Sequence, residues 1–107
     1  MRTPRTVRIY GVTYKVKVVS TEEIETTTGG EALGFADRDK KEILLAEGQE
    51  PHVLEDTFVH ECWHARLAES GVEDLIASHF DEDTAYRVIE AIVRNLTTAE
   101  LREKKRK

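Results

Sequence analysis

The stretch VLEDTFVHECWHARLAES, residues 53–70, carries the helical periodicity around which the rest of the chain is organised. Its apolar residues recur every three or four positions, at Leu54, Phe58, Cys62 and Ala65. This spacing predicts an α-helix with a wide apolar face. The residues His60, Glu61 and His64 fall on a different face, and Gly71 after the stretch is a good C-cap. We therefore expect a helix that buries one side and presents two histidines on another.

The string His60-Glu61-Cys62-Trp63-His64 is an HExxH motif. Histidines four residues apart on a helix lie one above the other, so both imidazoles can reach one Zn²⁺. Glu61 lies beside them, placed to take a proton from a metal-activated water. The alternative is a surface helix that carries two histidines by chance. Cys62 points about 200° away from His60 and is expected to be a small buried residue, and Trp63 to pack in the core or at its rim.

The composition fits one domain over residues 1–107. No apolar run is long enough to span a membrane, no signal peptide follows Met1, and the single cysteine excludes an internal disulfide. These features predict a cytoplasmic protein without a membrane partner. The basic tail at about 102–107 is a candidate nucleic-acid contact, and a frayed, solubilising helix end is the alternative.

The residues before the motif helix predict strands. Residues 5–20 alternate apolar and polar side chains, with a turn at Tyr10-Gly11-Val12, and residues 33–46 predict a second hairpin turned at 37–40. The Thr-, Glu- and Gly-rich residues 20–32 are expected to form a connecting loop or irregular edge. The predicted fold class is α+β, with a small, mostly antiparallel sheet followed by the motif helix and a second long helix.

The second long helix is expected to begin near Asp81, a natural N-cap. Residues 97–100, Thr-Thr-Ala-Glu, have the pattern of a capping box that restarts or bends this helix. Residues 72–78 fit either a helical extension or a loop. The core stripe of the second helix is Ala85, Ile89, Ile92 and Leu96.

A catalytic zinc site usually has three protein ligands and one open position. Glu82 is the preferred third ligand because, three residues before Ala85, it lies on the helix face that packs toward the core. Its alternative role is that of a first-turn carboxylate that complements the helix dipole. His52 is expected to be a surface histidine. The alternative third ligands are His79, Asp81, Asp83 and Glu90.

The chain resembles the small HExxH proteins of phages and prophages, kin to minimal zinc metallopeptidases of the ImmA/IrrE and SprT-like type. The resembling stretch runs from about Leu33 to Leu96 and covers Gly34, the strand at 42–45, the motif segment 54–65, and residues 82–85. The resemblance implies that a strand precedes the HExxH helix and that a glutamate opening the next helix, here Glu82, completes the metal site. Nothing like the helix-turn-helix region that often accompanies the ImmA/IrrE type is visible, so no regulatory target carries over.

These features together predict a zinc-dependent metallopeptidase that hydrolyses a peptide or protein substrate, in the host cytoplasm if the protein is phage-encoded. The strand at Ile43–Leu45 is a candidate for pairing with an extended substrate, and Tyr86 and Arg87 are candidate oxyanion donors. One alternative is a non-enzymatic module that holds structural zinc or binds a partner, although such a site has no need of Glu61. Another is a nucleic-acid-associated protease tethered by its basic tails. The sequence does not predict the oligomeric state.

Overall fold

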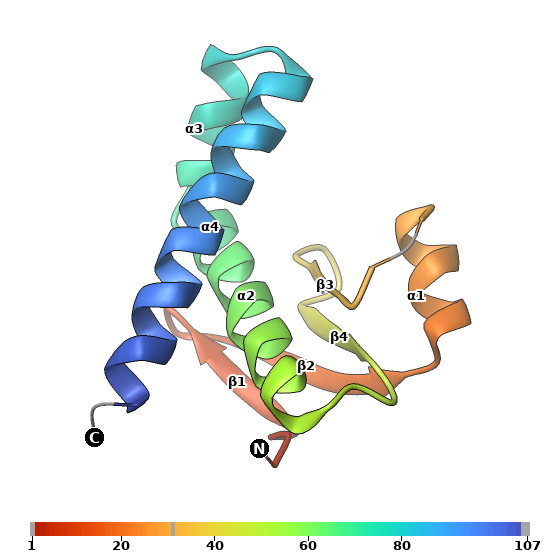
Figure 1. Cartoon of the computed structure of the whole chain (residues 1–107). Coiled ribbons are helices and arrows are strands. Elements are labelled where there is room, and N and C mark those ends of the chain that lie inside the picture. The colour runs from red at the N-terminus through yellow and green to blue at the C-terminus, as the bar shows by residue number, and fades with distance from the viewer. Residues whose placement is uncertain (1, 31, 106–107) are drawn as a thin grey trace.

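A computed structural model describes residues 2–30 and 32–105 of the chain. Helix α2 lies across one face of a four-stranded sheet, and α4 covers the side of α2 that faces away from the sheet (Figure 1). The fold is therefore α+β, as predicted. In chain order the elements are β1 (Thr6–Ile9), β2 (Val12–Val19), α1 (Thr21–Thr28), β3 (Gly34–Asp37), β4 (Glu42–Ala46), α2 (Pro51–Glu69), α3 (Val72–His79) and α4 (Glu82–Lys105).

The strand order in the sheet is β1-β2-β4-β3. The two predicted hairpins, β1–β2 and β3–β4, are both antiparallel, whereas β2 and β4 pair in parallel and join the hairpins into one sheet. A mostly antiparallel sheet is thus confirmed. Because β4 lies between β2 and β3, both of its edges are paired within the sheet, and β3 forms an edge of the sheet beside α2.

The connection between the hairpins contains a helix, so the expected loop at 20–32 is wrong. Helix α1 begins at a Ser20 cap, whose hydroxyl accepts the Glu23 backbone N–H at 3.1 Å. Its one buried residue, Ile24, packs against Leu44 and Ala46 on the sheet face opposite α2. A single apolar residue gives no helical period, although the Ser-x-x-Glu pattern at 20–23 is a helix-start signal.

The main core lies between α2 and the sheet. Alternate residues of β4 point to opposite faces, so Ile43 and Leu45 pack toward α2 while Leu44 and Ala46 pack toward α1. This two-sided burial explains why β4 is apolar at consecutive positions. The buried residues that form the α2 side of the core are Ile9, Tyr14, Ile43, Leu45, Cys62 and Ala65, and the burial of Cys62 confirms its predicted role.

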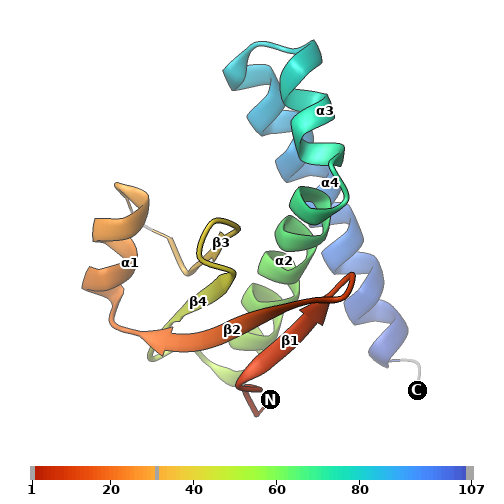
Figure 2. The ribbon, with the colours of Figure 1, turned by 180° about the vertical axis from the view of Figure 1, so that it is seen from behind.

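Beyond the sheet, α3 and the first turns of α4 pack against each other and project from the body of the molecule (Figure 2). Residues 72–78 are therefore helical, and Gly71, with φ 83°, separates α2 from α3. Asp81 caps α4, since its carboxylate accepts the Thr84 backbone N–H at 2.8 Å. The capping box at 97–100 neither restarts nor bends α4 into a new element, because the helix is continuous to Lys105.

The far end of the chain is helical where the structure describes it. Residues 102–105 of the basic tail belong to α4, while residues 106 and 107 lie outside the described part. Within residues 2–30 and 32–105, no helix is both long enough and apolar enough to cross a membrane.

Candidate metal centre

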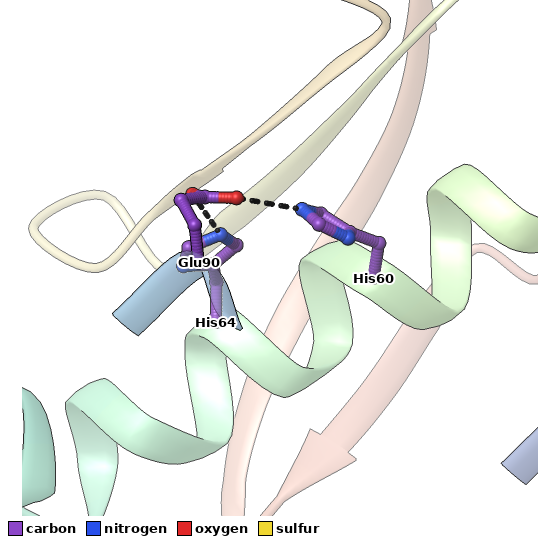
Figure 3. A group of neighbouring side chains, drawn as sticks. All are labelled: His60, His64 and Glu90. Carbon is purple, nitrogen blue, oxygen red and sulfur yellow. Dashed lines mark ion pairs between the residues drawn. The ribbon is translucent and has the colours of Figure 1, made fainter. Parts of the chain in front are cut away.

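Two histidines and one glutamate converge from α2 and α4 (Figure 3). The Nε2 atom of His64 lies 2.8 Å from one carboxylate oxygen of Glu90, and the Nε2 atom of His60 lies 3.4 Å from the other. The candidate ligand atoms all lie within 4.8 Å of one another. It is the one such group of three or more metal-binding side chains found among the described residues.

The two histidines lie where the sequence predicted, four residues apart on one face of α2. Glu82 does not join them: it is exposed in the first turn of α4, eight residues before Glu90 and so about 12 Å away along the helix axis. The reason is α3. Residues 72–79 form a helix, and the first turns of α4 pack against it. The part of α4 that lies level with the motif is therefore about two turns after Glu82, where Glu90 lies. The structure therefore favours Glu90, one of the alternatives, over Glu82 as the third ligand.

The other alternative ligands are engaged elsewhere. The His79 ring nitrogen Nδ1 lies 3.0 Å from the Leu75 carbonyl oxygen, Asp81 caps α4, and Asp83 forms an ion pair with Arg87. His52 is exposed at the start of α2, as predicted. The sequence offered Glu90 only as one of several alternative ligands, because periodicity does not show which turn of α4 lies level with the motif.

The donor set fits zinc. Two imidazole nitrogens and one carboxylate are ligands that catalytic zinc sites use, leaving a fourth position open. Bonds of about 2.0–2.1 Å in a tetrahedral site place two ligand atoms roughly 3.3 Å apart. The His60–Glu90 separation of 3.4 Å matches this spacing, whereas the His64–Glu90 separation of 2.8 Å is that of a hydrogen bond. The contact between His64 and Glu90 would therefore have to lengthen slightly for these groups to share one zinc ion.

The electrostatics of His60 also suit a metal ligand. Its side chain is 18% exposed, and this burial, assisted by the neighbouring His64, lowers the pKa of the imidazole below its usual value. The neutral form, which is the form that binds metal, is therefore favoured at physiological pH.

Glu61 is buried beside the histidines, with only 8% of its surface exposed. Burial, reinforced by the nearby Glu90 carboxylate, raises the pKa of Glu61 to about 8, and the Ala36 backbone amide offsets part of that rise. A buried carboxyl group without a cationic partner is costly to ionise. A metal ion in this site would supply the missing positive charge and favour the carboxylate form.

Strand β3 approaches the motif helix closely because residue 34 is glycine. A Cβ atom at Gly34 would lie 2.8 Å from Cγ2 of Thr57 and 3.0 Å from Cγ of Glu61. Thr57 has little freedom to move, because its hydroxyl lies 2.7 Å from Oε1 of Gln49 and 3.0 Å from the Val53 carbonyl oxygen. The single hydroxyl hydrogen can be donated to either acceptor. Gly34 therefore allows β3 to lie directly against the turn of α2 that carries Glu61.

A cleft of about 770 Å³ opens over the site. Residues 33–39, comprising β3 and its flanks, form one wall, and the C-terminal end of α1 extends that wall. His60, Glu61 and His64 lie within the cleft, and Glu90 belongs to the wall formed by α4. The predicted pairing of substrate with Ile43–Leu45 is wrong, because both edges of β4 are already paired. Edge strand β3 is the strand that lines the cleft.

The remaining motif residues fall outside the metal group. The Trp63 indole N–H donates to Glu100 at 3.1 Å, and the Arg66 guanidinium lies 4.5 Å from the centre of the Trp63 ring, so Trp63 packs at the rim of the core as predicted. Of the two candidate oxyanion donors, Tyr86 lines the cleft, whereas the Arg87 side chain pairs with Asp83.

The site lies at the junction of α2, α4 and β3. Comparisons of the chain with known protein families, with curated proteins and with solved structures find no match.

Proposed function

We propose that the protein is a zinc-dependent metallopeptidase in which His60, His64 and Glu90 hold the metal and Glu61 is the general base. The observation that supports this proposal most strongly is the convergence of a His-His-Glu group and a buried glutamate in one cleft. A structural zinc site is normally closed by four protein ligands and has no use for an adjacent buried carboxyl group. Three ligands beside Glu61 are the arrangement expected of a hydrolytic site.

The residues divide the chemistry between them. When bound, zinc acts as a Lewis acid that lowers the pKa of a water molecule and polarises the scissile carbonyl group. Glu61 accepts the proton of the attacking water and delivers it to the leaving amine. Its burial excludes bulk water from this proton transfer, and Gly34 lets β3 hold the Glu61 side chain in place.

Strand β3 and the cleft walls suggest how a substrate binds. An extended peptide can add to an exposed sheet edge through main-chain hydrogen bonds, and β3 is the edge strand that lines the cleft. Leu33 and Tyr86 line the same cleft and are 54% and 64% exposed, respectively. Such exposed apolar groups in a cleft favour a substrate with a bulky apolar side chain near the scissile bond.

We propose that the protein acts in the cytoplasm. Its single cysteine, Cys62, is a buried free thiol, and burial raises the pKa of that thiol to about 11. A thiol held in this protonated state is a packing residue of the core rather than a redox group.

Metal analysis and peptide hydrolysis test the proposed function. Purified protein should contain about one zinc per chain, and Glu61→Gln should keep the zinc while losing hydrolysis of an unstructured, apolar-rich protein such as casein. Glu90→Ala should lose zinc affinity, whereas Glu82→Ala is the matched control on the same helix and should retain it. Full zinc occupancy in Glu90→Ala, or hydrolysis by Glu61→Gln at the wild-type rate, would contradict the assignment.

A further inference from the structure

The ring of His60 has a second set of contacts on the side away from Glu90. Its Nδ1 atom lies 3.3 Å from Nη2 of Arg94, and Arg94 in turn donates to both oxygens of Asp56, at 3.0 and 2.9 Å. Asp56 lies one turn before His60 on α2, and Arg94 lies one turn after Glu90 on α4. The two helices are thus joined by an ion pair directly behind the metal group.

The contacts of His60 specify which ring nitrogen carries the proton. A guanidinium group only donates hydrogen bonds, so Nδ1 of His60 must accept from Arg94 and the proton must be on Nε2, which faces Glu90. Metal coordination through Nε2 requires the opposite tautomer, with the proton on Nδ1. That N–H would then point at an N–H of Arg94, and two donors would face each other without an acceptor.

Asp56 is the neighbouring acceptor, because its Oδ1 accepts from the same Nη2 of Arg94 that lies against Nδ1 of His60. Its two carboxylate oxygens offer about four acceptor positions, of which Arg94 uses two. A carboxylate that accepts the second N–H of a metal-bound histidine fixes the tautomer and the ring orientation, and loss of such a partner commonly weakens metal binding 10–100-fold. Arg94 has the reverse effect, since it competes as a donor at Nδ1 and places a positive charge beside the metal position.

We propose that Asp56 positions His60 for metal binding by accepting a hydrogen bond from its Nδ1–H, and that Arg94 opposes metal binding at the same nitrogen. This inference rests on the proposed zinc site. The Asp56–Arg94 pair then sets the zinc affinity of the site as well as joining α2 to α4.

Matched alanine variants separate this role from that of a simple helix clamp. Zinc affinity is measured on the full chain by competition with a chromophoric chelator. Asp56→Ala should weaken zinc binding about tenfold or more, whereas Arg94→Ala should strengthen it about threefold to tenfold. Asp83→Ala and Arg87→Ala remove an exposed ion pair on the same helix whose members bond to each other, and they should leave the affinity unchanged.

Asp56→Ala and Arg94→Ala shift the zinc affinity in opposite directions only if the proposal holds. A clamp that merely holds α2 against α4 is lost equally in either variant, so both affinities would then shift in the same direction. Shifts of the same sign, or no shift in either variant, overturn the proposal while leaving the zinc site itself intact. A wild-type protein that binds no zinc overturns the proposed function and this inference together.

Discussion

Helix α2 meets the rest of the protein through two faces of different chemistry. The face toward the sheet buries Cys62 and Ala65 among apolar side chains of the strands. On the side toward α4, where α4 buries Ala85 and Val93, α2 also makes polar contacts: the Asp56–Arg94 ion pair, the two histidines around Glu90, and the hydrogen bond from Trp63 to Glu100. One helix therefore carries the core on one side and nearly all of the candidate chemistry on the other.

The difference indicates what each face is for. Burial of apolar surface is non-directional and contributes most of the stability of a small domain. Polar contacts between helices contribute little net stability, because each exchanges water for a protein partner. A helix face that groups two half-buried imidazoles with a carboxylate, beside a buried Glu61, is costly for a structural contact. This cost is understandable if the face is a metal site.

The largest effect on stability is expected on the sheet face. Leu45 of β4 is fully buried on the sheet face that packs against α2, so Leu45→Ala should lower the free energy of unfolding by about 2–5 kcal/mol. Urea denaturation monitored by Trp63 fluorescence measures this loss. His64→Ala on the other face should cost much less in the metal-free protein, and equal losses in the two variants would remove the distinction between the faces.

Glu61→Gln should stabilise the metal-free protein, with a magnitude on the order of 4 kcal/mol at pH 8. Burial raises the pKa of Glu61 to about 8 in the folded protein, whereas the same group in the unfolded chain ionises near its ordinary value of 4.5. Folded Glu61 therefore keeps its proton as the pH rises from 4.5 to 8, while unfolded Glu61 loses it, and the wild type loses stability over this range. Glutamine does not titrate. Thermal unfolding between pH 4 and 8 should show the two proteins diverging with rising pH; parallel curves would mean that Glu61 is not buried as described.

Gly34→Ala should destabilise the protein by about 1–3 kcal/mol, because the added methyl group overlaps Thr57 and Glu61. Zinc binding should survive while hydrolysis falls, since the methyl group displaces the base rather than the ligands. Gly30→Ala is the control: a Cβ atom there meets nothing within 4 Å. Urea denaturation and chelator competition on both variants test the prediction, and wild-type stability and activity in Gly34→Ala would contradict it.

The smallest effect is expected for Arg87→Ala. Its ion pair with Asp83 is 73% exposed on both sides and lies outside both faces of α2, so the change in unfolding free energy should be within about 0.5 kcal/mol. A loss above 1 kcal/mol in the same denaturation assay would show that polar contacts on α4 contribute more to stability than this comparison of the two faces of α2 allows.

The parts of the fold that were predictable are those fixed by local spacing. Both hairpins follow from alternation and turn residues, α2 follows from its apolar period, and the His60–His64 pair needs only one helix to bring it together. Helix α1 escaped prediction because Ile24 is its sole buried residue, and the parallel β2–β4 pairing depends on where that helix directs the chain.

The third ligand depended on information that periodicity does not contain. The apolar stripe of α4 shows which face turns inward, but the level at which α4 crosses α2 depends on the length and direction of α3. Residues 72–78 did not reveal that helix, because none of its residues is buried. The sequence therefore favoured Glu82, which lies at the start of α4. Only the packing of α2, α3 and α4 showed that Glu90 is the glutamate beside the two histidines.

The central claim is that one zinc ion is held by His60, His64 and Glu90. Crystallography of the zinc-loaded protein, with anomalous data recorded at the zinc absorption edge, tests it most directly. A single anomalous peak should lie about 2.0–2.2 Å from Nε2 of both histidines and from a carboxylate oxygen of Glu90, with Glu61 beside it but unbound. A peak ligated by Glu82, or no peak between α2 and α4 at full zinc loading, would contradict the account.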